Sequence, residues 1–446
     1  MACSSRLIGV ACAALVTGFT SAESTSAAPA EPPTPAVIVA AARGAAQPIV
    51  GATGDYDGLL TAIGDARVVM LGEATHGSRE FHRERARITR RLIEDKGYVA
   101  VILEAPWEPV RRLDAYVGGG GFDARAALAG MVRFPRWMWR NADVRDFLDE
   151  LRDLNAQRPP ERRVRVVGMD LYSVPESADA VVRHVARKSI LAAALARQRY
   201  ACFDNYLPEP QFYGRDAESG RAPSCAEGAQ AQLDELAPAT SAGVDADDFA
   251  AWQSARVVKD GEAYYRATYR QDVSAWNLRE QHMADTIDQV LDRLGPGGKV
   301  VVWAQNIHQG DARATDQSLV GEVSLGQLMR ERHGMDAVLV GFSTHRGQVR
   351  AATGWGAPDR VWRLRPALPG SWSGLLHRVG LPAYVLVFRG QPTLAETFAA
   401  PRLERAVGVA YEPRTERRSH YFNMRLSRQF DAVIHVDVTS AVEPLR

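Results

Sequence analysis

Short apolar runs rich in β-branched residues recur along the chain and alternate with longer stretches of helical periodicity. Most of these runs are continuously apolar and lack the alternation of a strand that has one face in water. Continuous runs are typical of strands covered on both faces, as in a largely parallel sheet. We therefore predict an α/β fold with a central, mostly parallel sheet flanked by helices. The predicted strands are residues 67–71, 99–103, 164–167, 299–303, 337–340, 383–388, 407–410 and 432–436.

The segments between these strands carry the helical patterns. The predicted helices are residues 79–96, 144–156, 178–198, 275–294 and 324–332. Between residues 200 and 245 the pattern weakens into a stretch rich in Pro, Gly, Ser and acidic residues, followed by a helical segment rich in Trp and Tyr. We predict a loop-rich and helical insertion at about residues 200–295 that shapes a cleft.

Composition excludes several classes of protein. Of the 446 residues 46% are hydrophobic and 24% charged, with a formal net charge of +1. A disordered chain would have fewer apolar residues and a lopsided charge, and collagen would have far more Gly and Pro. Nucleic-acid binders usually carry a basic stripe, so the balanced charge argues against a nucleic-acid partner.

The first 30 residues have the layout of a secretory signal. Arg6 precedes an apolar run at residues 7–19, and a small-residue zone with cleavage points after Ala22 or Ala28 follows. The run is shorter than the roughly 20 residues that span a bilayer, so we expect no transmembrane span in the mature protein. This predicts export to the periplasm or secretion. The alternative is a mis-assigned start, which would leave a cytoplasmic protein.

Removal of this leader would leave Cys202 and Cys225 as the cysteines of the mature chain. An oxidising compartment would let them pair, and closing that loop would stabilise the fold by about 3 kcal/mol on the chain-entropy model. Two inert thiols are the alternative.

Polar residues follow several of the predicted strands directly. In open α/β sheets the ligand crevice lies beyond the carboxyl ends of the strands. Carboxylates are rarely buried unless they are paired, so those at one sheet edge need partners such as histidine or arginine. The sequence thus predicts one polar cluster that contains Glu73, His76, Glu104, Asp170, Asn306 and His308.

Several reaction types lack their motifs. The sequence contains no Gly-x-Ser-x-Gly elbow, no His-Glu-x-x-His, no P-loop and no cysteine pair at zinc spacing. A hydrolytic option that remains is a histidine acting as general base on water. A carboxylate would orient this histidine, and a second histidine or an arginine would face the developing oxyanion.

Four of the strand-end segments, together with later ones, resemble the erythromycin esterase family, and the similarity runs from about residue 37 to the C-terminus. The matching segments are GEATHG (72–77), ILEAPW (102–107), GMDLYS (168–173), WAQNIHQGDARAT (303–315), RYACFD (199–204), SAWNLR (274–279) and ERRSHYF (416–422).

The resemblance implies an α/β fold with a helical part that shapes a deep cleft. It also implies that His76 is the general base, that Glu73 and Glu104 are active-site carboxylates, and that Arg85 and His308 complete the catalytic set. Asp170, Asn306 and Tyr172 would contact substrate or support these residues.

The leading hypothesis is therefore a hydrolase that cleaves a small-molecule ester or lactone without a metal or other cofactor. The best-known members of the family confer antibiotic resistance by opening the macrolide lactone, but those enzymes are typically cytoplasmic, in contrast to the predicted leader. One alternative is a metal-dependent hydrolase with Glu73, His76, Glu104 and His308 as ligands. Another is a non-catalytic exported protein that binds haem or a polyketide-like ligand.

Overall fold

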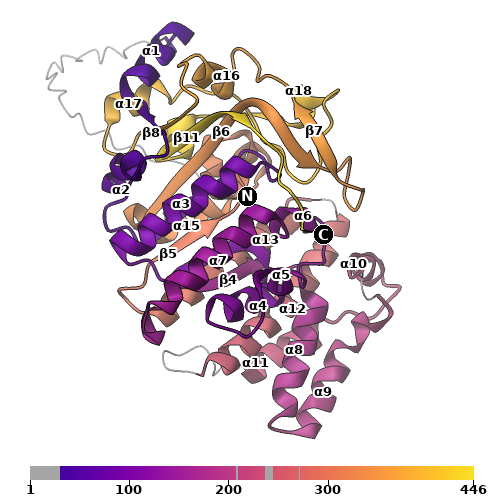
Figure 1. Cartoon of the computed structure of the whole chain (residues 1–446). Helices are drawn as coiled ribbons and strands as arrows, with labels where there is room; N and C mark the ends of the chain where they lie inside the picture. The colour runs from indigo at the N-terminus through magenta and orange to yellow at the C-terminus, as the bar shows by residue number, and fades with distance from the viewer. Residues whose placement is uncertain (1–30, 207–208, 237–244, 271, 446) are drawn as a thin grey trace, which may run out of the picture. The chain divides into compact units, whose positions relative to one another are not determined.

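A nine-stranded sheet forms the centre of the fold in the computed structural model of the chain (Figure 1). Its strand order is β1-β8-β11-β6-β2-β5-β3-β4, and β7 pairs with β6. Strands β11, β6, β2, β5, β3 and β4 run parallel, whereas β1, β8 and β7 join antiparallel. The strands are β1 Gln47–Pro48, β2 Val68–Leu71, β3 Ala100–Pro106, β4 Arg165–Asp170, β5 Val300–Trp303, β6 Ala337–Ala351, β7 Arg360–Leu364, β8 Ala383–Val387 and β11 Ala432–Thr439, with a separate pair β9 Arg402–Arg405 and β10 Tyr421–Met424.

The structure describes residues 31–206, 209–236, 245–270 and 272–445. The predicted leader at residues 1–30 lies outside this range. Among the helices of the described residues, none has the length and apolar character needed to cross a membrane.

Helices cover both faces of the sheet, which confirms the interpretation of the continuous apolar runs. Along β2, Val69 and Leu71 belong to one hydrophobic cluster and Val68 and Met70 to another. The first cluster packs against α2, α3, α4, α5 and α7, and the second against α1, α13, α15, α16 and α19. These helices are α1 Pro35–Ala45, α2 Asp57–Ile63, α3 Arg79–Lys96, α4 Trp107–Val117, α5 Ala124–Leu128, α7 Ala142–Ala156, α13 Ser274–Leu294, α15 Leu325–His333, α16 Trp372–His377 and α19 Leu426–Gln429.

A separate group of helices lies beyond the sheet, in the lower part of Figure 1. It consists of α8 Val174–Ala186, α9 Ile190–Tyr200, α10 Gln211–Glu218, α11 Ala226–Leu236 and α12 Ala246–Arg270. Their apolar side chains form a third cluster, inside which Cys202 and Cys225 are joined by a disulfide with a Cα–Cα distance of 5.8 Å. The remaining short helices are α6 Arg136–Trp139, α14 Asn306–Gln309, α17 Pro392–Thr397 and α18 Glu416–Ser419.

The helical group differs from the sequence prediction in two ways. The single helix predicted at 178–198 is split into α8 and α9, because Ser189 caps a new helix by accepting a hydrogen bond from the amide of Ala192. The stretch predicted as loop-rich contains α10 and α11 in its described part. Short helices separated by Pro, Gly and Ser dilute the apolar periodicity that a sequence pattern can detect.

The strand predicted at 407–410 is wrong. That segment makes only isolated bridges, Val407 with Thr75 and Ala410 with Ala352, and the strand lies earlier, at β9. Its apolar character has another cause, because Gly408 and Val409 line a cavity described below. Strand β6 is also longer than predicted and continues past the sheet to form a hairpin with β7.

Candidate active site

The strand order brings the predicted polar residues together. Strands β2, β5, β3 and β4 are consecutive neighbours and parallel, so their carboxyl ends meet at one edge of the sheet. The residues that follow these four strands therefore converge, as expected for the ligand crevice of an open α/β sheet.

The loop after β2 is held tightly in place. The amide of His76 donates to the carbonyl of Val407 at 3.1 Å, and the amide of Val407 donates to the carbonyl of Ala74 at 2.9 Å. A Cβ at Gly77 would collide with the backbone of Arg350, so only glycine permits this approach. These contacts fix where the His76 side chain points.

His76, Glu73 and Arg85 form one buried chain of contacts. Nδ1 of His76 lies 2.6 Å from Oε1 of Glu73, and Nη2 of Arg85 lies 2.7 Å from Oε2 of the same carboxylate. Burial favours the protonated carboxyl, but Arg85 and His76 outweigh it and hold the pKa of Glu73 below its usual value. An ionised Glu73 keeps the proton of His76 on Nδ1 and leaves Nε2 as an acceptor.

The guanidinium of Arg85 is buried beside Trp303 and His82. Arg85 is fully buried on α3, and its guanidinium carbon lies 4.8 Å from the ring centre of Trp303. Burial and the charge of Arg85 lower the pKa of the neighbouring His82 to about 3. His82 is therefore neutral, and its Nδ1 can accept from Nη2 of Arg85 at 3.0 Å. These contacts hold the guanidinium against Glu73.

A second charged group occupies the ends of β3 and β4. Nη2 of Arg279, from α13, lies 2.8 Å from Oε1 of Glu104 and 2.6 Å from Oδ2 of Asp170. Burial would raise the pKa of Glu104, but His308 and Arg279 outweigh it and lower that pKa well below its usual value. The other oxygen of Glu104 accepts the amide of Gln305 at 2.9 Å. One guanidinium thus bridges two buried carboxylates.

His308 lies beside this group and carries a charge of its own. Its Nδ1 is 2.5 Å from Oε1 of Glu280, its Nε2 is 3.3 Å from Oε1 of Glu104, and its ring stacks on Trp276 at 4.7 Å. Burial and Arg279, whose Nη1 is 3.1 Å from Nε2, oppose protonation. Glu280 and Glu104 are stronger and raise the pKa of His308 to about 9. At neutral pH this imidazole is a cation and a donor.

Three of the residues predicted to be catalytic, His76, Glu104 and His308, line a cavity of about 240 Å³, which we call the catalytic cavity after that prediction. Its floor is charged, and its walls come from the loop at 130–139, the segment at 408–409 and the turn between β6 and β7. The polar and ionisable residues that line it are His76, Glu104, Arg133, Arg136, Asp170, Tyr172, Ser173, Glu176, Arg279, Gln305 and His308.

Comparison with known proteins identifies the family of the chain. A model of the erythromycin esterase family matches residues 93–439. The chain belongs to the erythromycin esterase family. Membership of this family supports a hydrolase. The matched residues begin after the loop that carries Glu73 and His76. The assignment of these two residues to the site therefore rests on the geometry and not on the family match.

Solved structures share the fold. A Bacillus cereus protein has a TM-score of 0.78 at 19% identity, covering 93% of this chain and 100% of its own. A succinoglycan biosynthesis protein has a TM-score of 0.76 at 22% identity, covering 92% and 98%. A mutant of the erythromycin esterase EreC in its open conformation has a TM-score of 0.65 at 16% identity, covering 88% and 96%. At these identities the likeness concerns the fold.

Most of the residues predicted for the active site lie together in the structure. The catalytic cavity is lined by His76, Glu104, Asp170, Tyr172 and His308. Glu73 contacts His76, and Arg85 contacts Glu73. Asn306 does not reach the cavity. Its side chain donates to the carbonyl of Phe342 at 2.7 Å and accepts that residue's amide at 3.1 Å, so it ties the loop after β5 to β6.

The residues that hold the predicted carboxylates and His308 in place were not themselves predicted. Arg279 and Glu280 come from the second turn of α13, not from a strand end. Arg279 holds Glu104 and Asp170, and Glu280 holds His308. Several buried carboxylates at one sheet edge need a cation as partner, and this need pointed to an arginine in the site. The sequence pattern does not say which of the many arginines it is.

Proposed function

We propose that the protein hydrolyses a carboxylic ester or lactone with water activated by His76. The observation that carries this proposal is the 2.6 Å contact between Nδ1 of His76 and Glu73. It leaves Nε2 as the basic atom of a residue that lines the cavity, and the cations Arg279 and His308 line the same cavity. A base of fixed tautomer and an electrophilic wall are what attack of water on an ester requires.

In the proposed reaction, Nε2 of His76 takes a proton from water while the water oxygen bonds to the ester carbonyl carbon. The negative charge moves to the carbonyl oxygen, where the guanidinium of Arg279 or the imidazolium of His308 can stabilise it. The carbon–oxygen bond to the alcohol then breaks, and His76 returns its proton to the leaving alkoxide. Glu73, which Arg85 holds in place, orients the imidazole and stabilises its charged form.

The charge balance favours this reaction over the metal-dependent alternative. Glu104 and Asp170 already share the guanidinium of Arg279, and Glu280 is taken by His308. Within residues 31–445, as far as they are described, no three His, Cys, Asp or Glu side chains converge to hold a metal ion. A metal would have to displace Arg279, whose pKa the carboxylates raise well above its usual value against the effect of burial.

The mouth of the catalytic cavity suggests what the substrate looks like. Val132, Phe134 and Trp355 form an apolar lip, in which Val132 and Trp355 are 60% and 58% exposed. The Trp355 ring lies 5.2 Å from Phe134 and 6.2 Å from Tyr172. The cavity volume of about 240 Å³ is below the roughly 300–1,000 Å³ of most ligand pockets. We therefore propose an ester whose reacting group enters the cavity while an apolar part, as in a macrolide, rests on the lip.

A Trp355→Ala variant tests this assignment of the lip. For esters with a large apolar group we expect KM to rise at least about tenfold, since burying an aromatic side chain contributes about 1.5–3 kcal/mol and each step of about 1.4 kcal/mol is a factor of ten. For an acetyl ester of a small alcohol, kcat/KM should stay unchanged. Val361→Ala, an exposed position on the same hairpin outside the cavity lining, is the control. Equal effects on large and small esters would argue against a substrate contact at Trp355.

The proposed function itself is tested with a panel of esters and lactones that includes a 14-membered macrolide. Hydrolysis is measured with purified protein before and after treatment with a chelator. Turnover of at least one substrate that survives chelation is the expected result. Absence of turnover across the panel would contradict the esterase proposal, and loss of turnover on chelation would support the metal-dependent alternative.

The charge on His308 predicts a pH dependence of stability. Its pKa is about 9 in the folded protein, against about 6.5 in an unfolded chain. The stabilisation is therefore complete below about pH 6.5 and is lost as the pH rises through about 9. We expect the free energy of unfolding in urea to fall by up to a few kcal/mol across this window. In His308→Gln this fall should be absent, and an unchanged fall would refute the assigned charge.

A further inference from the structure

The helix α9 is apolar on the side that faces solvent as well as on the side that packs. Its first seven residues, ILAAALA at 190–196, include no polar side chain. Ala193 and Ala196 are buried in a small cluster with α8. Ile190 and Leu191 are 83% and 82% exposed, more than any other large hydrophobic side chain among the described residues. A helix that is apolar all round is normally covered on every side.

The exposed apolar residues of α9 form one patch. Ile190, Leu191, Ala194 and Leu195 stand at positions i, i+1, i+4 and i+5, which lie on one side of an α-helix. Leu195 is 41% exposed, and Ala194 beside it is exposed too. Exposed apolar surface that is contiguous marks contact with another protein or with a membrane. We call these four residues the α9 patch.

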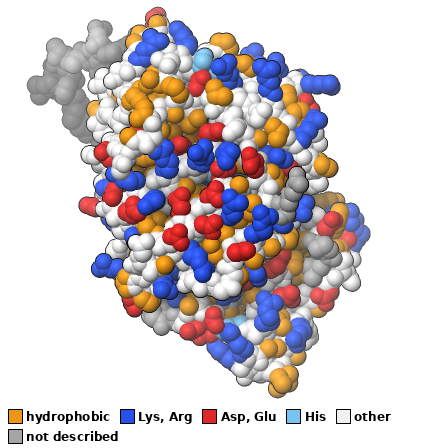
Figure 2. Space-filling view, in the orientation of Figure 1, with side chains coloured by type: hydrophobic (Ala, Val, Ile, Leu, Met, Phe, Trp, Pro, Cys, Tyr) orange, Lys and Arg blue, Asp and Glu red, His pale blue; other side chains and the backbone are white. Residues whose placement is uncertain are grey.

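The α9 patch lies at the end of a helical hairpin. Helices α8 and α9 pack against each other, and the turn between them lies at the lower end of the helical group in Figure 1. Ile190 and Leu191 belong to the first turn of α9, directly after that connection. Figure 2 shows hydrophobic side chains at this end of the molecule, with Lys and Arg side chains nearby. Apolar side chains at such an end can touch a flat surface.

The segment that carries the patch is basic. Residues 180–203 include five Lys and Arg residues and no Asp or Glu. Two of the five, Arg183 and Arg197, are exposed, and no carboxylate of the described residues forms an ion pair with either. Arg197 follows Ile190 by seven residues, so the two lie on the same side of α9. The patch therefore has unpaired positive charge next to it.

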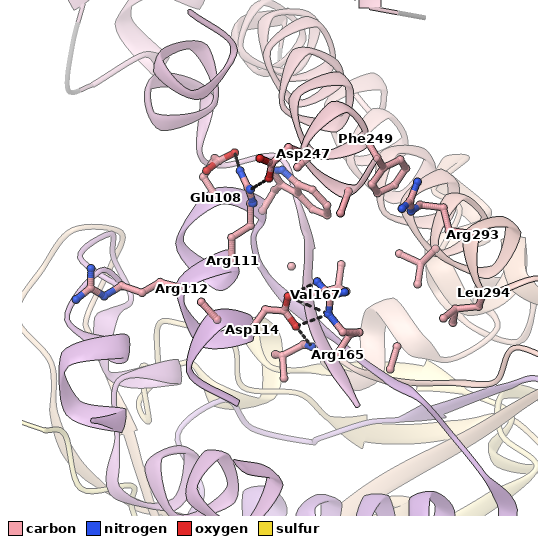
Figure 3. Close-up of a pocket in the computed structure, with 18 residues that line it drawn as sticks. Glu108, Arg111, Arg112, Asp114, Arg165, Val167, Asp247, Phe249, Arg293 and Leu294 are labelled. Atoms are coloured by element: carbon pink, nitrogen blue, oxygen red, sulfur yellow. Dashed lines mark hydrogen bonds and ion pairs between the residues drawn. The ribbon is translucent and has the colours of Figure 1, made fainter. Parts of the chain in front are cut away.

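Acidic residues of α12 neutralise two further cations only in part. Asp247 lies 3.2 Å from Arg187. Figure 3 shows that Asp247 also pairs with Arg111, 3.9 Å away at the rim of a cavity along β4, so its one charge is shared between two arginines. Asp248 lies 2.7 Å from Lys188. Exposed ion pairs of this kind contribute little stability, so an anionic surface can compete for the cations.

The charge around the patch distinguishes between possible partners. In a contact between two copies related by a two-fold axis, the same surface faces itself. Arg183 and Arg197 of one copy would then meet the same cations of the other copy, and like charges oppose such a contact. A bilayer with anionic lipids instead offers an apolar layer to the α9 patch and negative headgroups to the arginines.

We propose that the α9 patch binds the surface of a bilayer that contains anionic lipids. Ile190 and Leu191 enter the boundary between headgroups and acyl chains, while Arg183 and Arg197 keep their guanidinium groups at the level of the headgroup phosphates. This contact holds the protein on the bilayer surface, and salt weakens it. The proposal is independent of the ester hydrolysis proposed for the catalytic cavity.

Sedimentation of the full chain with lipid vesicles tests the proposal. We expect binding to vesicles of equal parts phosphatidylglycerol and phosphatidylcholine at about 0.1 M salt. Binding to vesicles of phosphatidylcholine alone should be at least about tenfold weaker, since each cation near an anionic surface contributes a factor of about five. Residues 1–30 are the same in every protein compared, so differences between variants report the α9 patch.

Leu191→Ser should weaken binding to the anionic vesicles at least about tenfold, because a leucine side chain leaves the apolar layer. Leu319→Ser is its control and should leave binding unchanged, since Leu319 is 81% exposed but lies in a stretch, residues 316–322, whose charged residues are acidic. Arg197→Gln should weaken binding to the anionic vesicles about fivefold. Arg417→Gln removes the same charge from an exposed position on α18 and should have no effect.

All four substitutions are at exposed positions, and circular dichroism and thermal unfolding check that each variant folds. The proposal is overturned if the wild type does not sediment with the anionic vesicles, if it binds both kinds of vesicle equally, or if Leu191→Ser binds like the wild type. Analytical ultracentrifugation without lipid tests the other occupant. A dimer that Leu191→Ser dissociates would show that a second copy covers the α9 patch, and that result would also overturn the proposal.

Discussion

We expect His76→Ala to lower kcat/KM for ester hydrolysis by about 10²- to 10⁴-fold, the usual contribution of a positioned general base. The alanine variant lacks the basic Nε2 that takes the proton from water, and Glu73 then has no imidazole to orient. The loss should appear mainly in kcat, because His76 acts on the attacking water and the lip holds the apolar part of the ester. Rates with a short ester, measured at saturating concentration, separate the two constants.

A matched histidine provides the control for this prediction. His333 also binds a carboxylate, with its Nε2 2.7 Å from Asp288, but it ends α15 and does not line the catalytic cavity. His333→Ala should hydrolyse esters at the rate of the wild type. If His76→Ala retains wild-type rates while still folded, the base is another residue and the proposed mechanism is wrong.

The sheet was largely predictable because its strands are buried on both faces. Burial makes each strand a continuous apolar run, and the alternation of Val68 and Met70 with Val69 and Leu71 between two clusters shows the cause. A continuous apolar run does not indicate a strand where the run is apolar for another reason. The segment at 407–410 is apolar because it lines the catalytic cavity and clamps the loop of His76. Sequence alone cannot separate the two causes.

The site was predictable to the extent that it follows strand ends. His76, Glu104, Asp170 and His308 meet because their strands are neighbours. Asn306 satisfies the same rule, yet its amide bonds to the backbone of β6. The helix α13 supplies the missing cation and carboxylate through tertiary packing, since a charged residue inside a helical pattern is usually on a solvated face.

On the surface, apart from the buried charges of the site, side chains of both signs are mixed. Figure 2 shows Lys and Arg interspersed with Asp and Glu over the face in view, with no extended basic stripe there. That agrees with the balanced composition, 54 basic against 53 acidic residues. Net charge therefore says little about a buried cluster in which one guanidinium bridges two carboxylates.

The largest effect on stability should come from Arg279→Met. The variant keeps much of the side-chain volume but leaves Glu104 and Asp170, which are 6% and 2% exposed, without their shared guanidinium. Breaking a buried ion pair by removing one partner costs about 3–5 kcal/mol, because a charge stays buried without compensation. We expect a loss of this size in the free energy of unfolding at neutral pH, measured with urea, together with loss of hydrolysis.

The pH dependence of this loss distinguishes lost charge compensation from lost packing. In the wild type the pKa of Glu104 is held down, so its contribution is present above about pH 4.5 and is lost as the pH falls. In the variant the unpaired carboxylates gain by protonation, so the difference between the two proteins should shrink on acidification. Arg332→Met is the matched control, since Arg332 also bridges two carboxylates, Asp285 at 2.9 Å and Asp288 at 2.6 Å, at more exposed positions. Its cost should stay within about 1 kcal/mol. A loss for Arg279→Met that does not vary with pH would show that the guanidinium acts through packing, and the charged floor of the cavity would then need a different explanation.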